Sequence, residues 1–113
     1  FLKKQIIKCQ KNNINKNIII VDPGIGFGKT YEHNIQILKN LKIFHKLKCN
    51  ILIGLSRKKF LSNFNKKEKP IDRIAGTIAA NQFALDQGVD IIRVHDVKEA
   101  FQAKLVWQSL NKN

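Results

Sequence analysis

Three short apolar segments, each followed by a polar or glycine-rich turn, constrain the fold of this chain more than any other feature. They are residues 18–21, 51–53 and 89–94. They lack the strict alternation of a half-exposed sheet, which favours strands buried on both faces, as in parallel sheets. Ile51 follows Ile18 by 33 residues, and Ile91 follows Ile51 by 40. Such intervals are typical of strand–helix units joined by crossover connections.

The segments between these strands have the apolar spacing of helices. Helices are predicted over about 2–10, 31–47, 72–87 and 97–110. Asp72 is a predicted N-cap, and Gly88 stands just beyond the predicted end of the same helix. Asp96 and Glu99 form a capping-box pattern at the start of the last helix. The sequence therefore predicts a helix followed by three strand–helix units, an α/β fold.

The length of 113 residues suits about one small domain. No apolar run approaches the roughly 20 residues that a membrane span needs. The chain contains no methionine and begins with Phe1, so we expect a processed chain or, more simply, a fragment that lacks its N-terminal part. Three strands cannot close a barrel, and they form either a small open sheet or the last part of a larger structure.

The strongly basic composition raises an alternative function. Lys and Arg number 21 against 8 Asp and Glu, a net charge of +13, and basic side chains drive binding to nucleic-acid phosphates. Only Arg57, Arg73 and Arg93 are arginines, and one Trp and one Tyr are available for base stacking. A non-enzymatic α/β fragment that binds nucleic acid or other polyanions is therefore the alternative, and the main expectation is no nucleic acid and no membrane.

The cysteines give no metal or disulfide motif. Cys9 and Cys49 form no CxxC pair, and His45 lies four residues before Cys49 without further ligands nearby. Two ligands do not make a structural zinc site. We expect two unpaired thiols in a reducing compartment, and hence a cytoplasmic protein without metal ligands in this chain.

The first predicted strand ends on the segment DPGIGFGKT, residues 22–30. A Walker A loop would need glycine where Pro23 stands, and a dinucleotide fingerprint needs GxGxxG rather than GxGxG. The glycines allow tight turns and close approach of a ligand. Asp22 either accepts hydrogen bonds from paired N–H groups of a ligand or caps the turn before Pro23.

The second and third strands also end on polar side chains. After the second, Lys58 is a donor for a carbonyl or ring nitrogen and Ser56 a contact for a second substrate; alternatively, this segment is a helix start with solvated basic residues. After the third, alternation places Arg93 and His95 on the same side of the strand. These two suit an anion such as phosphate. The alternative is a buried Arg93 paired with Asp96.

With these motifs in view, the chain resembles the dihydropteroate synthases, the pterin-binding TIM-barrel enzymes of folate synthesis. The resemblance rests on four segments in the family's order and approximate spacing. They are DPGIGFGKT at 22–30 with HN at 33–34, GLSRKKF at 54–60, RIAGT at 73–77 and RVHDV at 93–97. Each is weak alone, but four in register cover nearly all of residues 18–99.

The resemblance implies that residues 1–113 are the C-terminal part of a single pterin-binding barrel domain, the last three βα units of a (β/α)8 barrel. The family joins 6-hydroxymethyl-7,8-dihydropterin diphosphate to para-aminobenzoate and releases 7,8-dihydropteroate and diphosphate. It also implies a homodimer of the full-length chain and Mg²⁺ bound with the diphosphate, its protein ligand lying in the missing N-terminal part. We expect this chain alone to be inactive and prone to aggregate.

The same resemblance assigns roles to residues. Lys58, Arg93 and His95 are the expected catalytic residues. Asp22 and Lys58 are expected to bind the pterin, and Arg93 and His95 the leaving diphosphate. The expected lining of the para-aminobenzoate side comprises Phe27, Gly54 and Ser56. The substrate-binding set is completed by Gly26 and Arg57.

Overall fold

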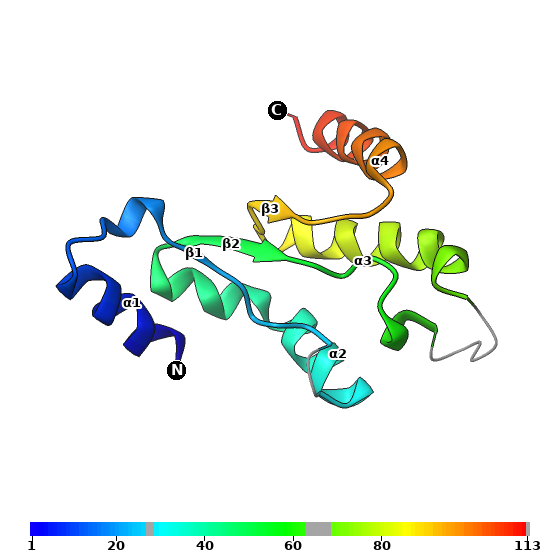
Figure 1. Ribbon diagram of the computed structural model, residues 1–113. Coiled ribbons are helices and arrows are strands. Elements are labelled where there is room, and N and C mark those ends of the chain that lie inside the picture. The colour runs from blue at the N-terminus through cyan, green and yellow to red at the C-terminus, as the bar shows by residue number, and fades with distance from the viewer. Residues whose placement is uncertain (27–28, 63–68, 113) are drawn as a thin grey trace.

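The computed structural model describes residues 1–26, 29–62 and 69–112. Over these ranges the chain forms a three-stranded parallel sheet of β1 (Ile20–Val21), β2 (Asn50–Ile53) and β3 (Ile91–Ile92), with β2 in the middle (Figure 1). Val21 lies opposite Ile51, and Ile53 lies opposite Ile92. The predicted parallel arrangement is confirmed, although each outer strand is shorter than its apolar run.

Four α-helices accompany the sheet in the described part of the chain. They are α1 (Leu2–Lys11), α2 (Tyr31–Lys39), α3 (Ile74–Asp86) and α4 (Val97–Leu110). Short 3₁₀ helices cover Lys16–Ile18, Leu41–Leu47, Lys59–Ser62 and Pro70–Arg73. Helix α4 lies beside α3 (Figure 1), and the Trp107 indole N–H links the two by donating to Asp86 at 2.7 Å. The predicted α-β-α order is confirmed.

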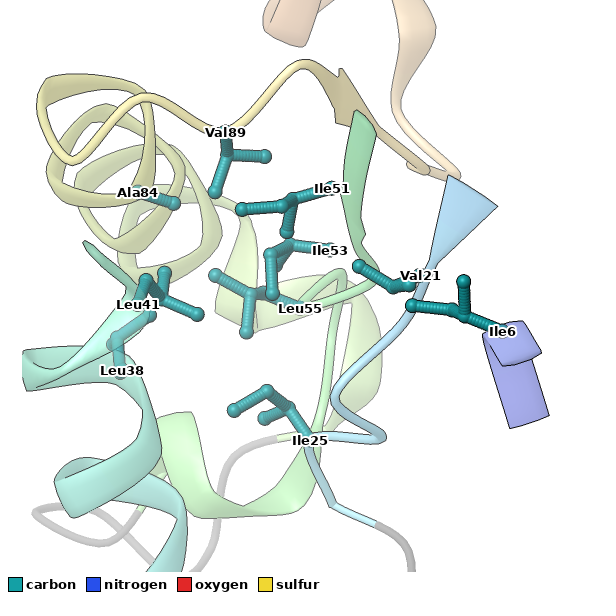
Figure 2. Packing of buried hydrophobic residues seen from close by; sticks show 10 residues of the cluster. All are labelled: Ile6, Val21, Ile25, Leu38, Leu41, Ile51, Ile53, Leu55, Ala84 and Val89. Atoms are coloured by element: carbon teal, nitrogen blue, oxygen red, sulfur yellow. The ribbon is translucent and has the colours of Figure 1, made fainter. Parts of the chain in front are cut away.

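The core lies on one face of the sheet. Ile51, Ile53 and Leu55 stand in the middle of the buried cluster, all fully buried (Figure 2). The remaining members are Ile6, Val21, Ile25, Leu38, Leu41, Ala84 and Val89. Ile20, whose side chain points to the opposite face, is 50% exposed. The expectation of strands buried on both faces is therefore wrong for this chain, because its helices cover only one.

The predicted helix over 31–47 is interrupted at Asn40. The Asn40 amide donates to the Gln36 carbonyl at 2.8 Å, and the chain continues as a 3₁₀ helix from Leu41. Short amide side chains compete with the helix for its own backbone groups. Leu38 and Leu41 are nevertheless both buried, so the apolar spacing predicted the contact face correctly.

The helix caps differ from prediction at two of three positions. Asp72 lies in the preceding 3₁₀ helix, where its carboxylate accepts the Lys69 backbone N–H at 3.2 Å. Asp96 occupies the N-cap position of α4 but makes no capping hydrogen bond. Gly88 confirms its prediction, since its φ is +87° and its N–H donates to the Leu85 carbonyl at 2.9 Å.

Cys9 and Cys49 are free thiols, as expected. Within residues 1–26, 29–62 and 69–112, the helices are too short or too polar to span a bilayer.

Candidate active site

Most of the predicted functional side chains gather in one pocket at the carboxyl ends of β2 and β3. The pocket has a volume of about 260 Å³ and is lined by Gly54, Ser56, Lys58, Arg93 and His95, together with Val94. Parallel strands bring their carboxyl ends to the same edge of a sheet, which is where ligand sites of α/β proteins lie. The sequence placed these residues at strand ends, and the topology brings them together.

Lys58 connects this pocket to the loop after β1. Its ammonium group donates to the backbone carbonyl of Ile25. Burial lowers the pKa of Lys58, while the carboxylate of Asp22 opposes this effect and the Arg93 cation adds to it. Asp22 and Arg93 are therefore each close enough to Lys58 to act on its charge, the first in favour of it and the second against it.

Asp22 caps the turn before Pro23, which is one of the two roles predicted for it. Its Oδ1 accepts the Gly24 backbone N–H at 2.8 Å. No hydrogen bond to its second oxygen, Oδ2, is found among the described residues, and the side chain is exposed. Asp22 can therefore cap its turn with one oxygen and accept a ligand's N–H group with the other.

Gly26 allows the loop after β1 to pass close to Lys58. A Cβ at this position would lie 2.9 Å from Cδ of Lys58, and φ is +91°, a conformation that favours glycine. The Gly26 N–H donates at 2.8 Å to the side-chain Oδ1 of Asn34, a residue that is 2% exposed. Phe27, predicted to line the para-aminobenzoate side, lies outside the described residues.

Arg93 places an exposed cation at the end of β3. Its backbone N–H donates to the Ile53 carbonyl at 2.9 Å, which extends the parallel ladder. Its guanidinium forms no ion pair or hydrogen bond with the described residues and lies over Gly54, where a Cβ would be 2.5 Å from Nη2. The alternative of a buried Arg93 paired with Asp96 is wrong, because Arg93 is exposed and Asp96 binds another arginine.

Ser56 holds His95 in place. The Ser56 side-chain oxygen accepts the His95 backbone N–H at 3.0 Å and lies 2.9 Å from Nδ1 of the same imidazole. Ser56 is 7% exposed, whereas His95 is exposed. One ring nitrogen is therefore occupied inside the protein, which leaves Nε2 as the ring nitrogen for a ligand.

Arg57 is the ion-pair partner of Asp96. Its Nε and Nη2 donate to the two oxygens of Asp96 at 3.0 and 2.5 Å. This hydrogen-bonded pairing lowers the pKa of Asp96 and raises that of Arg57. The sequence suggested a different task for each residue, a helix cap for Asp96 and substrate contact for Arg57. The substrate contact of Arg57 stays a prediction.

Sequence reasoning about chemistry missed the supporting residues of the site. Asn34, Arg73 and Thr77 are all buried, and each makes a hydrogen bond to a loop that carries a predicted site residue. They belong to the HN and RIAGT segments. These residues could have been found as polar side chains at positions where the helical spacing predicts a side chain facing the sheet.

The described residues do not suit a divalent cation by themselves. They contain no group of three or more His, Cys, Asp or Glu side chains that could hold one. Mg²⁺ takes oxygen ligands, but here Asp96 is bound to Arg57, and the Lys58 cation lies near Asp22. The arrangement instead suits an anion, since Lys58, Arg93 and His95 face one pocket.

Comparison with known proteins shows the family of the chain. A family model described as pterin binding enzyme matches residues 1–95. Dihydropteroate synthase of Escherichia coli strain K12 is 40% identical over 103 residues, which cover 91% of this chain and 36% of that protein. The dihydropteroate synthase of Bacillus subtilis strain 168 is 41% identical over 100 residues, 88% of this chain and 35% of that protein.

Solved structures give the same result. The dihydropteroate synthase of Xanthomonas albilineans in complex with 7,8-dihydropteroate superimposes with a TM-score of 0.95 at 36% identity, over all of this chain and 43% of that one. The Yersinia pestis synthase gives 0.93 at 36% identity, over 99% and 52%. The chain thus spans about a third to a half of the length of these relatives and has the α/β fold of the matching part. With a family match over residues 1–95 and these synthases among its relatives, the chain belongs to the pterin-binding enzymes.

Proposed function

We propose that the complete protein is a dihydropteroate synthase, to which this chain contributes the last three βα units of the barrel and the C-terminal part of its single domain. The pocket that joins Lys58, Arg93 and His95 carries the proposal. Support also comes from the synthases of which this chain matches about two fifths. The alternative of a polyanion-binding fragment explains the charge of +13 but none of the three strand-end motifs.

In the proposed reaction, 6-hydroxymethyl-7,8-dihydropterin diphosphate loses its diphosphate, and para-aminobenzoate takes its place. The C–O bond to the diphosphate breaks, the arylamine nitrogen bonds to the methylene carbon, and one N–H proton is released. Negative charge develops on the leaving group, so fixed cations aimed at it lower the barrier. Arg93, unpaired among the described residues, and the Nε2 of His95 supply this stabilisation.

The pterin is held from the other side of the pocket. Asp22 accepts N–H groups of the amino-pyrimidinone edge with the oxygen that its turn does not use. Lys58 donates to the pterin carbonyl and ring nitrogen. The Asp22 carboxylate raises the pKa of Lys58, and the Arg93 cation lowers it. Gly54 and Ser56 line the para-aminobenzoate side with Phe27, and Gly26 completes the substrate-binding set.

Three further expectations accompany this proposal. Mg²⁺ binds with the diphosphate through ligands outside the described residues, since these residues alone do not suit it. The complete protein is a cytoplasmic homodimer. Exposed apolar side chains on α4, such as Phe101 and Leu110, are in keeping with a further interface there.

The test is product formation by the protein expressed with the whole of its reading frame. We expect 7,8-dihydropteroate to form from both substrates, and Arg93→Ala to reduce kcat/KM for the pterin diphosphate far more than affinity for para-aminobenzoate. Lys98→Ala, which removes an exposed cation from α4, is the matched control. A folded protein that makes no product would contradict the proposal, and unchanged kinetics in Arg93→Ala would remove Arg93 from the site.

A further inference from the structure

Two consecutive residues after β2 bind two consecutive residues after β3. Ser56 accepts the backbone N–H of His95 at 3.0 Å, and Arg57 holds Asp96 through two hydrogen bonds. The Asp96 side chain is 12% exposed, so water screens this pair less than an ion pair on the open surface. The two loops that carry the proposed pterin-binding and diphosphate-binding groups are therefore held together by hydrogen bonds and an ion pair.

Arg57 also has an unusual backbone. The Lys58 N–H donates to the Leu55 carbonyl at 3.2 Å, which closes a turn with Arg57 in its third position. The φ of Arg57 is +56°, the left-handed region that a turn of this kind ordinarily gives to glycine or asparagine. A residue other than glycine remains in that region only when its surroundings hold it there.

Helix α3 and the helical turn before it hold this backbone on both sides. The Arg57 N–H donates to the Thr77 hydroxyl at 3.0 Å, and the Arg57 carbonyl accepts from Nη1 of Arg73 at 2.8 Å. Thr77 and Arg73 are 3% and 8% exposed. Both peptide groups of Arg57 and two of its guanidinium nitrogens are thus committed within the protein.

Lys58 is the next residue, and the direction of its side chain depends on this turn. From the turn it reaches across the pocket to the Ile25 carbonyl, past the position where Gly26 lacks a Cβ. A change in the conformation of Arg57 would move the Lys58 ammonium relative to Arg93, which lines the same pocket.

We propose that Asp96 is a positioning residue that fixes, through its ion pair with Arg57, the turn that presents Lys58 to the pterin. Asp96 acts on the substrate only through that lysine, and the Arg57 guanidinium braces the turn. The proposal rests on the proposed function, because it takes Lys58 as a pterin-binding group.

The test compares Asp96→Asn with Glu99→Gln in the complete protein. Both changes remove one negative charge from the start of α4, but Glu99 is exposed and forms no hydrogen bond through its side chain among the described residues. We expect Asp96→Asn to reduce kcat/KM for the pterin diphosphate about tenfold and to change the KM for para-aminobenzoate less than about twofold. Glu99→Gln should match the parent, and Arg57→Lys, which keeps the charge but loses the two-pronged geometry, should match Asp96→Asn.

Repeating the Asp96→Asn substitution in a Lys58→Ala variant shows whether Asp96 acts by positioning Lys58 or by stabilising the fold in general. If Asp96 acts through Lys58, then Asp96→Asn should cost less than about twofold in kcat/KM when Lys58→Ala is already present. A loss of about tenfold in that background would overturn the proposal. Thermal melting of each variant shows whether it is folded.

Binding of pterin-6-carboxylate, followed by its fluorescence, gives a readout that needs no catalysis. We expect Asp96→Asn to bind it about tenfold more weakly than Glu99→Gln. A parent that binds the pterin but makes no product overturns the proposed function and leaves this comparison intact. A parent that is active, with Asp96→Asn equally active, overturns only the role of Asp96. A folded parent that neither binds the pterin nor makes product overturns both.

Discussion

The guanidinium of Arg93 depends on a neighbour with no side chain. A Cβ at Gly54 would lie 2.5 Å from Nη2 and 3.0 Å from Cζ of Arg93. The backbone of Gly54 does not have the positive φ found at Gly24, Gly26 and Gly88, so alanine fits its conformation. The clash falls on the flexible end of Arg93, which can move away, so the site is affected more than the fold.

We therefore predict that Gly54→Ala raises the KM for the pterin diphosphate about tenfold, the loss of one charge-assisted hydrogen bond of about 1.5 kcal/mol. The melting temperature should change little. In an Arg93→Ala background the same substitution should have no further effect on this KM. An equal loss in both backgrounds, measured by steady-state kinetics, would show that Gly54 acts independently of Arg93.

Lys58 makes the site sensitive to alkaline pH. Burial is the main cause that lowers its pKa, so Lys58 loses its proton at a lower pH than an exposed lysine does. Since the proposed pterin contact uses the cation, kcat/KM for the pterin diphosphate should fall as pH rises, beginning below the range where ordinary lysines titrate. Lys58→Arg should move this alkaline limb to higher pH. An alkaline limb at the same pH in both proteins would assign it to another group.

The same shift has a consequence for stability. The folded pKa of Lys58 lies below the unfolded one, so between the two values the unfolded chain binds more protons. The burial of charged Lys58 therefore opposes folding at neutral pH, and this cost diminishes as pH rises through the folded pKa. The residue is placed for its function at the expense of stability.

Residue types in sequence indicated which groups carry chemistry but not how they are divided between tasks. Arg93 and Lys58 could be singled out because cations at strand ends need a reason to be there. The partner of Asp96 could not be predicted, because its capping-box spacing is local and Arg57 is 39 residues away in sequence. A bidentate arginine outcompetes a backbone N–H for the same carboxylate.

At the scale of elements, the predicted helix failed where a side chain competes with the backbone for a hydrogen bond. The three strands and the α4 bounds follow from apolar spacing, and parallel pairing follows from the crossover lengths. The break at Asn40 depends on one side-chain amide that can hydrogen-bond four residues back. The burial of only one sheet face depends on what lies against the other face, which the composition of a strand does not reveal.

Helix α3 contains one glycine that could be replaced with benefit. Gly76 lies in the first turn of α3, and a Cβ there would meet Cβ of Leu61 at 3.6 Å, an ordinary contact. Alanine loses less backbone freedom than glycine on folding into a helix. We predict that Gly76→Ala raises the free energy of unfolding by about 0.5–1 kcal/mol, measured by urea denaturation, with unchanged kinetics. A destabilised variant would show that Leu61 cannot accommodate the added methyl group.

At the scale of the whole molecule, the chain has more surface than its mass requires. Its accessible surface is 8019 Å², whereas a compact monomer of this mass exposes about 6,300 Å². Its radius of gyration is 15.2 Å, against about 13 Å for a compact domain of this length. The excess includes large apolar side chains such as Ile20, Phe101 and Leu110. Such surface stabilises a structure only when another element covers it.

The sheet has open edges as well. In the described part of the chain, β2 pairs on both sides, whereas β1 and β3 each pair on one side, and unpaired strand edges are templates for association. Asp22 and Arg93 follow these two edge strands, so these two proposed binding groups lie at open edges of the sheet. In a closed barrel, further strands would pair with both edges and bring their own loops to the same end.

We therefore predict that the purified 113-residue chain makes no dihydropteroate and aggregates, as measured by product formation and light scattering. The same chain joined behind the N-terminal part of the Escherichia coli synthase, which it matches over 36% of that protein's length, should be monodisperse and active. Lys58→Ala in the joined protein should lower the activity strongly but leave it measurable, without loss of solubility, because that side chain serves the site and not the interface. A monodisperse 113-residue chain that makes product from both substrates would show that three strand–helix units are enough.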